Sequence, residues 1–283
     1  MTTITTIFRT LFLMIFIHLF LTTQVTFGQS TAKNYIVLLD LSDRLLTAQQ
    51  PERDKAIIQA IFKSFEEQVR KNYYIYSHDS FKVSIIPQEG GIDEQRYTQE
   101  LFIDMAKLGI KDKRVQLDRL KAQMPALLNK LYAEATKNKV QSKQFQGTDI
   151  WRYFNDYLSS DLQKNAQNKL FILTDGYFDF ESNRYIGKQG NRSTDSRMIA
   201  RLRNLPNWKE VLALPNEGLI PITKNFTHLG VSIIEITPKN MVLQELDIIY
   251  ALWRKWLTEM KVQKVNFLNK GNIAQITQHI GEL

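Results

Sequence analysis

Two short, uninterrupted apolar runs, each followed by an aspartate, constrain the fold of this chain most strongly. "YIVLL" at 35–39 precedes Asp40, and "LFIL" at 170–173 leads through a threonine to Asp175. Aliphatic runs of this length without polar alternation are typical of strands buried on both faces of a parallel sheet. Because an unpaired buried carboxylate is costly, the acids either lie in solvated turns or belong to one site.

The rest of the chain alternates strand-like and helix-like segments, which predicts an α/β sheet with crossover helices. Further strands are expected at 81–87, 229–238 and 264–268. Helices are expected at 49–72, 112–139 (interrupted or kinked at Pro125), 147–162 (with Thr148 as a capping residue) and 240–260. Residues 96–108 fit either a helix or an antiparallel edge strand.

The segment from about 178 to 227 departs from this alternation. It is rich in polar residues, Gly and Pro, and predicts at most one or two short helices. Connections of this length are uncommon in compact domains and are often functional or mobile. We interpret it as an insertion that leaves the sheet from the same edge as Asp175 and that contributes to partner specificity.

The first 28 residues are typical of a secretory signal peptide. Arg9 precedes an apolar run from Leu11 to Leu21, and Thr26 and Gly28 supply small residues before a cleavage site. An uncleaved anchor is the alternative, although this run is shorter than the ~20 residues of a spanning helix. We therefore expect an exported protein, periplasmic or at the cell surface, with one domain at 30–283 and membrane contact only through an uncleaved signal.

Composition excludes several classes of function. The chain has no cysteine, which excludes disulfides, thiolate metal sites and a cysteine nucleophile. Its net charge of +8 is compatible with an acidic partner or an anionic envelope surface. Residues 107–143 carry ten Lys or Arg against three Asp or Glu, and residues 183–204 are also basic. Polyanion binding therefore stays open, although nucleic acid is not expected as the partner of an exported protein.

Asp40 and Asp175 each follow a predicted parallel strand, and in open α/β sheets ligands bind outside such strand ends. Ser42 lies two residues after Asp40, and Thr148 stands at a loop-to-helix boundary expected at the same edge. Three separate segments thus bring two carboxylates and two hydroxyls to one place.

The motifs "DLSDR" at 40–44, "GTD" at 147–149 and "LTDG" at 173–176 resemble, in order and spacing, the metal-ion-dependent adhesion site (MIDAS) of von Willebrand factor A (vWA) domains. The resemblance covers most of residues 33–270. It implies a doubly wound, mostly parallel Rossmann-like sheet with helices on both faces, and an antiparallel edge strand within 96–108.

The resemblance also implies a function. Asp40, Ser42, Thr148 and Asp175 would ligate Mg²⁺, or alternatively Mn²⁺ or Ca²⁺, all of which prefer oxygen ligands. The ion would engage an acidic group of another protein, here one of the cell envelope, without catalysis. Asp43, Asp149 and Asp179 lie close in sequence and either tune this site or are solvated loop acids.

Arg44 departs from the family pattern, because it stands where the second serine of the motif is expected and a guanidinium cannot ligate a cation. Two arrangements stay open. Arg44 points outward and the site keeps one more water, or Arg44 pairs with Asp40 or Asp175 and replaces the metal. The second arrangement would make the protein a metal-free scaffold of an envelope assembly.

Enzymatic readings find less support. A haloacid-dehalogenase-type phosphotransferase needs a second Asp where this chain has Ser42, and a later acid pair where it has Gly176. The three histidines after the signal segment show no metal-ligand spacing and adjoin no nucleophile motif. A Gly-rich phosphate-binding loop is also missing from the sequence. We therefore expect neither catalysis nor a small-molecule substrate.

Overall fold

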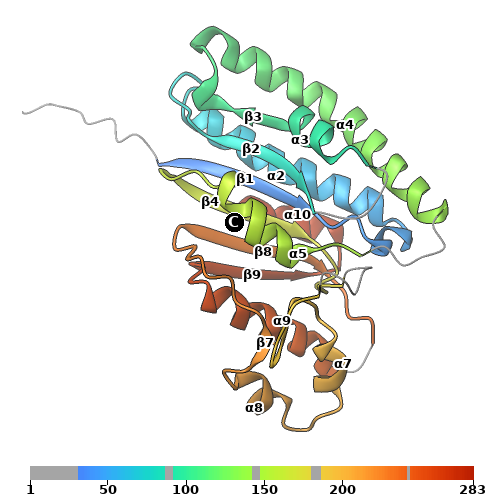
Figure 1. The fold of residues 1–283 in the computed structure, drawn as a ribbon. Helices are drawn as coiled ribbons and strands as arrows, with labels where there is room; N and C mark the ends of the chain where they lie inside the picture. Colours follow the sequence, from blue (N-terminus) through green and yellow to red (C-terminus); the bar gives the residue numbers. More distant parts are fainter. Residues whose placement is uncertain (1–30, 87–91, 142–146, 180–185, 241–242) are drawn as a thin grey trace, which may run out of the picture. The chain divides into compact units, whose positions relative to one another are not determined.

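The main sheet has six strands in the order β3-β2-β1-β4-β8-β9 (Figure 1). The structure is a computed structural model that describes residues 31–86, 92–141, 147–179, 186–240 and 243–283. The expected signal peptide lies outside the described residues. All neighbouring strands are parallel except β3, which is antiparallel to β2. The strands are β1 (Ala32–Leu39), β2 (Ser80–Ile85), β3 (Phe102–Asp104), β4 (Ala166–Leu173), β8 (Leu229–Ile236) and β9 (Lys264–Asn269).

Helices cover both faces of this sheet because alternate strand residues point to opposite sides. In β1, Tyr35, Val37 and Leu39 join one buried apolar cluster, whereas Ile36 and Leu38 join the other. The first cluster packs under α2 (Gln50–Lys71), α4 (Ile110–Gln141) and α10 (Ile273–Glu282). The second packs under α5 (Ile150–Arg152), η3 (Tyr153–Tyr157), α6 (Leu158–Asp161), α7 (Met198–Arg203), α8 (Trp208–Ala213) and α9 (Leu243–Glu259). The prediction of a mostly parallel α/β sheet is confirmed.

The edge of the sheet is more complex than the sequence indicated. Residues 96–108 are neither one helix nor one strand, because α3 (Glu94–Glu100) precedes the three-residue β3, and the short helix η2 (Met105–Lys107) follows it. Asp93 starts α3 by accepting a hydrogen bond from the Arg96 backbone N–H. The expected antiparallel strand is therefore present but confined to residues 102–104.

The predicted insertion contains the two short helices α7 and α8, as expected, and also a small sheet that was not expected. This sheet has the order β5-β6-β7, with β5 (Lys188–Gln189), β6 (Asn191–Ser193) and β7 (Glu217–Leu219). Strands of two or three residues are too short to show a periodicity. Helix α4 continues through Pro125, so of the two predicted alternatives, an interruption or a kink, the interruption is wrong.

The order of the strands positions the candidate site. From β1 the chain proceeds to β2 and β3 on one side, and it then returns to β4 on the other side of β1 and continues to β8 and β9. The strand order therefore reverses between β1 and β4, the strands that precede Asp40 and Asp175. Among the described residues, no helix is long and apolar enough to span a membrane.

Gly176, directly after Asp175, holds the β4 end against α9. Its φ of +100° suits glycine, and an added Cβ would lie 2.9 Å from Ile249 Cγ2 and 3.3 Å from Ile236 Cγ2. We expect Gly176→Ala to lower the free energy of unfolding by about 2–4 kcal/mol, because backbone strain and overpacking add. Urea unfolding measures this loss.

Gly190→Ala is the matched control, since Gly190 also has a positive φ of +60° but nothing lies within 4 Å of its added Cβ. It should cost about 1 kcal/mol through backbone strain alone. Equal losses for the two variants would contradict the packing argument.

Candidate functional site

The Asp40 carboxylate is buried at the end of β1 and accepts three hydrogen bonds. Its Oδ1 accepts from the Ser42 backbone N–H and from Thr148 Oγ1, each at 2.9 Å, and its Oδ2 accepts from Thr174 Oγ1 at 2.7 Å. Thr148 and Thr174 lie 108 and 134 positions away in the chain. One carboxylate therefore joins three segments of the sequence at the edge where β1 and β4 end.

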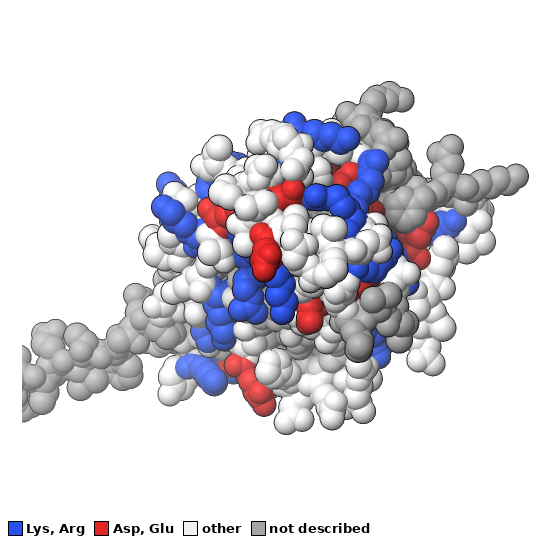
Figure 2. All heavy atoms as spheres, turned by 90° about the horizontal axis from the view of Figure 1, so that it is seen from below, with Lys and Arg blue, Asp and Glu red and all other residues white. Residues whose placement is uncertain are grey.

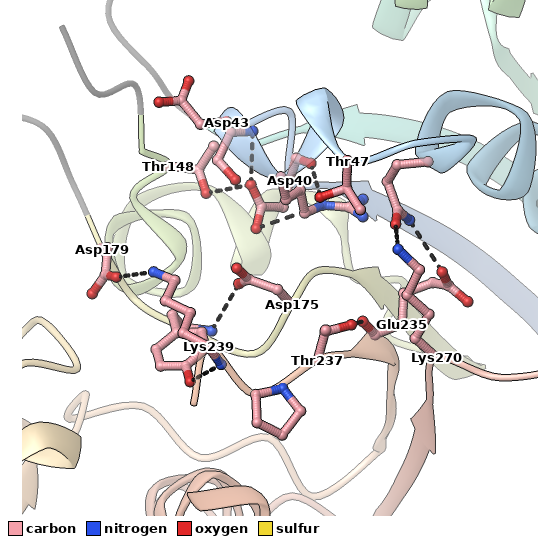
Figure 3. A pocket seen from close by; sticks show the side chains of 15 residues that line it. Asp40, Asp43, Thr47, Thr148, Asp175, Asp179, Glu235, Thr237, Lys239 and Lys270 are labelled. Atoms are coloured by element: carbon pink, nitrogen blue, oxygen red, sulfur yellow. Dashed lines mark hydrogen bonds and ion pairs between the residues drawn. The ribbon is translucent and has the colours of Figure 1, made fainter. Parts of the chain in front are cut away.

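Asp175 faces Asp40 across this edge (Figure 3). Its carboxylate accepts the Tyr177 backbone N–H at 3.2 Å, and no ion pair to it is found within the described residues. Burial, together with the negative charge of Asp40, raises the pKa of Asp175 to about 7. Two adjacent carboxylates in a partly buried place call for a shared proton or a neighbouring cation.

Thr148 has a different role from the predicted helix cap. The capping residue of α5 is Asp149, whose carboxylate accepts the Arg152 backbone N–H at 2.8 Å. The Thr148 hydroxyl instead donates to Asp40, and its backbone N–H donates to the Asp179 carbonyl at 2.9 Å. Asp149 thus stabilises the helix start and leaves the Thr148 hydroxyl at the site.

Arg44 points inward, beneath the two strand ends, and does not point outward. Its Nε donates to the Asp40 carbonyl oxygen at 2.8 Å, and one terminal nitrogen donates to the Leu173 carbonyl oxygen at 3.0 Å. The same terminal nitrogen pairs with Asp54 of α2 at 2.7 Å. Burial by itself lowers the Arg44 pKa, but Asp54 and Asp40 outweigh it and raise the pKa, so the guanidinium stays charged.

The main ionic partner of Arg44 is therefore Asp54, and its contact with the Asp40 carboxylate is longer. Its Nε lies 3.9 Å from Asp40 Oδ2, beyond hydrogen-bonding distance. Tyr132 Oη of α4 also donates to Asp54, at 3.1 Å. The predicted pairing with Asp40 is thus only a long contact, and the main ionic partner comes from a helix that the sequence did not connect with the site.

Gln50 connects Asp54 to a second buried carboxylate, that of Glu235. Gln50 Nε2 donates to Asp54 at 2.9 Å and to Glu235 at 3.1 Å. Arg53 binds both carboxylate oxygens of Glu235, at 2.6 and 2.7 Å, and Lys270 Nζ donates to Gln50 Oε1 at 2.8 Å. Glu235 has a φ of +75°, a strained backbone that its ion pair and hydrogen bonds hold in place.

Lys239 is the cation on the solvent side of the site. Its Nζ lies 2.5 Å from Asp179 Oδ2 and 4.2 Å from the centre of the Tyr177 ring. Burial lowers the Lys239 pKa, but Asp179 and then Asp175 outweigh it, so the pKa is raised. Its ammonium therefore also compensates part of the negative charge of Asp175.

A cavity of about 290 Å³ lies at this edge of the sheet, and Asp40, Asp175 and Lys239 are among the residues that line it (Figure 3). All four predicted ligands reach it, namely Asp40, Ser42, Thr148 and Asp175. Of the adjacent residues, Asp43, Arg44 and Asp179 line the cavity, whereas Asp149 does not appear in its lining. Sequence reasoning missed Thr174, Lys239, Asp54 and Glu235. Of these four residues, only Thr174 could have been found from the sequence, because it lies within the "LTDG" motif.

The donor set of this cavity fits a hard divalent cation. It offers carboxylate and hydroxyl oxygens, which Mg²⁺ prefers, and one carboxylate without an ion pair among the described residues. No group of three or more His, Asp or Glu that could hold a metal is found in the described part of the chain. A cation here would therefore depend on the two hydroxyls and on water in addition to two carboxylates.

Several basic residues in the described part of the insertion are paired with acids. Arg192 pairs with Glu259 at 2.7 Å, and Arg201 and Arg203 pair with Glu217 and Glu245. At the end of the molecule that carries α7 to α9, basic and acidic side chains lie next to one another (Figure 2). This arrangement weakens the case for polyanion binding by residues 183–204.

No family model matches the chain, and no match is found among curated proteins. A search of solved structures finds the pilus adhesin SpaC from Lactobacillus rhamnosus GG, with a TM-score of 0.43 and 10% sequence identity. The match covers 89% of this chain and 30% of the adhesin chain, so this chain spans less than a third of its length. A similarity at this level identifies no family.

The Arg44–Asp54 pair generates a prediction about stability. Arg44→Ser, which restores the serine of the motif, leaves the Asp54 carboxylate buried without its cation. We expect a loss of about 3–5 kcal/mol in the free energy of unfolding. Adding Asp54→Asn should recover part of this loss, since the second change removes the uncompensated charge.

Arg114→Ser is the control, because Arg114 forms an exposed ion pair with Asp118 at 3.7 Å. Its effect should stay within about 0.5 kcal/mol. Denaturant unfolding compares the four proteins. An Arg44→Ser variant as stable as wild type would mean that Asp54 does not depend on Arg44.

Proposed function

We propose that this protein is an exported, non-catalytic vWA-like domain that binds another protein of the cell envelope. In this proposal Asp40, Ser42, Thr148 and Asp175 hold a divalent cation, Mg²⁺ or alternatively Mn²⁺ or Ca²⁺, in a MIDAS-like site. The observation that carries the proposal is the meeting of these four residues, from three distant segments, around one cavity.

The strand order supports the fold part of the proposal. A mostly parallel sheet whose order reverses between β1 and β4, with helices packed on both faces, agrees with a doubly wound vWA-like architecture. In such sheets ligands bind at the carboxyl ends of the strands beside the reversal. Asp40 and Asp175 lie at these ends.

Each of the four residues has a distinct part in the proposed site. Asp40 orients the Thr148 hydroxyl by accepting its hydrogen bond, so that the oxygen lone pairs of Thr148 remain available for a cation. Asp175 supplies the carboxylate that has no ion pair among the described residues. A bound cation with an open coordination position would attract an acidic side chain of the partner.

The insertion is the proposed source of specificity for the partner. Its first described residues, 178 and 179, follow directly from the β4 end, and Asp179 lines the cavity. A partner that approaches the cavity would therefore also meet this segment. The N-terminal sequence up to Gly28 supports export of the domain.

A metal-free scaffold is the second candidate, and two observations favour it. Arg44 lies beneath Asp40, and Lys239 lowers the electrostatic cost of ionising Asp175. These two cations supply part of the positive charge that a metal ion would supply. The two candidates differ in whether an added cation stabilises the fold.

Thermal unfolding with and without Mg²⁺ or Mn²⁺ tests the metal site. An ion that binds only the native state stabilises it by about 1.4 kcal/mol at ten times its Kd. For a domain of this size we expect a rise in Tm of about 3–5 °C. The rise should disappear in Asp175→Asn, which keeps the shape of the side chain but removes its charge.

Asp40→Ala should also abolish the rise and should lower the Tm in the absence of metal, since three hydrogen bonds are lost. A wild-type protein that shows no rise at any tested concentration would support the metal-free scaffold. A rise that persists in Asp175→Asn would place the cation elsewhere.

Lys239→Gln should increase the affinity for Mg²⁺ by about tenfold, because one positive charge near the cavity is removed. Isothermal titration calorimetry measures the change. Lys188→Gln, at an exposed lysine of the insertion, is the control and should leave the affinity unchanged. A weaker affinity in Lys239→Gln would mean that Lys239 supports the site and does not compete with the cation.

A further inference from the structure

Exposed apolar side chains gather at the end of the sheet opposite the candidate site. They belong to the loop between α2 and β2 and to the start of α4. Tyr73 is 73% exposed, Tyr76 63% and Ile75 41%, and Ile110 of α4 is 68% exposed. Lys113 of α4 connects the two elements, since its Nζ donates to the Ile75 carbonyl oxygen at 3.0 Å. We call Tyr73, Ile75, Tyr76 and Ile110 the apolar edge.

The loop that carries the apolar edge is held in a defined conformation. Tyr73 and Tyr74 have φ values of +52° and +56°, which are unfavourable for tyrosine. A backbone hydrogen bond from the Tyr74 N–H to the Val69 carbonyl oxygen at 3.1 Å maintains it. The Lys113 side chain also supports it, because its Nζ donates to the Ser77 carbonyl oxygen at 2.7 Å. The exposed tyrosines are therefore presented by a fixed turn.

Lysines flank the apolar edge. Lys33 is the second residue of β1, and its backbone N–H donates to Asp79 at 2.8 Å, next to the loop. Lys264 is the first residue of β9, and Lys169 is the fourth residue of β4. They lie close enough that Lys33 and Lys264, in addition to burial, lower the pKa of Lys169 to about 8. Lys71 at the end of α2 and Lys111 at the start of α4 are exposed beside the tyrosines.

Acceptors at this end neutralise only part of this charge, since Lys169 Nζ donates to a Leu283 oxygen at 2.8 Å and Lys107 pairs with Asp104 at 3.4 Å. Asp79 and Asp104 are buried and accept hydrogen bonds from their own loops, and Asp161 pairs with Lys82. Asp112 and Glu282 are the exposed acids of the neighbouring helix ends. Lys71 and Lys111 are the exposed lysines nearest in sequence to the apolar edge.

The chain also enters the sheet at this end. The first described residue, Thr31, leads directly into β1 (at the left in Figure 1). The 30 residues before it include the apolar run from Leu11 to Leu21. The chain therefore joins that segment to the domain at this end of the sheet.

We propose that the apolar edge and its flanking lysines dock the domain on a bilayer that contains anionic phospholipid. Tyrosine side chains favour the membrane interface because they have an apolar ring and a polar tip. Lysines close to an anionic surface add electrostatic attraction. Docking through this end directs the candidate site, at the opposite ends of the strands, away from the membrane and toward a partner.

The chain has no cysteine, so a single introduced cysteine can carry a fluorophore at a chosen position. Residues 31–283 are suitable for this experiment because both apolar clusters lie entirely between Tyr35 and Ile280. Tyr76→Cys, labelled with an environment-sensitive fluorophore, should shift to shorter wavelength with vesicles of phosphatidylcholine and phosphatidylglycerol. Val140→Cys, 72% exposed near the end of α4 and roughly 45 Å along that helix from Ile110, is the control and should not shift.

A vesicle sedimentation assay tests the lysines separately. Lys71→Gln with Lys111→Gln should weaken binding to anionic vesicles by about tenfold, and high salt should weaken wild-type binding similarly. Lys130→Gln with Lys137→Gln is the matched control, because these exposed lysines lie on the same helix α4 but roughly 30 Å or more from Ile110.

Three outcomes would overturn the proposal. The first is a failure of wild type to bind anionic vesicles. The second is an equal shift at positions 76 and 140, which would indicate non-specific adsorption. The third is tight binding to a soluble polyanion such as heparin that shifts the label at position 76 as strongly as vesicles do. That result would identify a polyelectrolyte surface in place of a lipid-docking surface.

Discussion

The burial of the Asp40 carboxylate is the constraint on which the rest of this site depends. A buried carboxylate is tolerable only when donors surround it, and here the donors come from the loop after β1, the loop before α5 and the end of β4. These hydrogen bonds bring Ser42, Thr148 and Asp175 to one edge. The parallel pairing of β1 with β4 makes this possible, because neighbouring parallel strands end at the same side of the sheet.

Charge is arranged in two layers around Asp40. In the deeper layer, Arg44 pairs with Asp54, and Arg53 with Glu235, so those buried acids carry their own cations. In the outer layer, Asp175 faces the cavity with only the partial compensation of Lys239. The excess negative charge is thereby concentrated at the cavity. The proposed cation would remove this excess, and in the metal-free alternative a proton or Lys239 would offset it.

The sequence predicted most of the elements that build this edge. Long apolar periodicity identified α2 and α9, and uninterrupted aliphatic runs identified β1, β4 and β8. Helix α10 was missed, and so was the small sheet of the insertion, whose strands are too short to show a pattern. Thr148 was expected to cap a helix because its hydroxyl could do so, but Asp149 takes that position. Local signals cannot decide between adjacent residues with equivalent capping ability.

The sequence by itself determined that two buried strands end at acids and that hydroxyl residues follow in matching order, since strand burial and turn chemistry are local properties of the chain. It could not determine the direction of Arg44, because both directions satisfy local sterics. Only the tertiary structure decided this, by placing Asp54 of α2 within 2.7 Å of the guanidinium. Tertiary packing likewise brought Lys239 to the cavity, where it pairs with Asp179. Ion pairs between distant segments depend on how helices and strands pack, so they do not appear as a periodic pattern in the sequence.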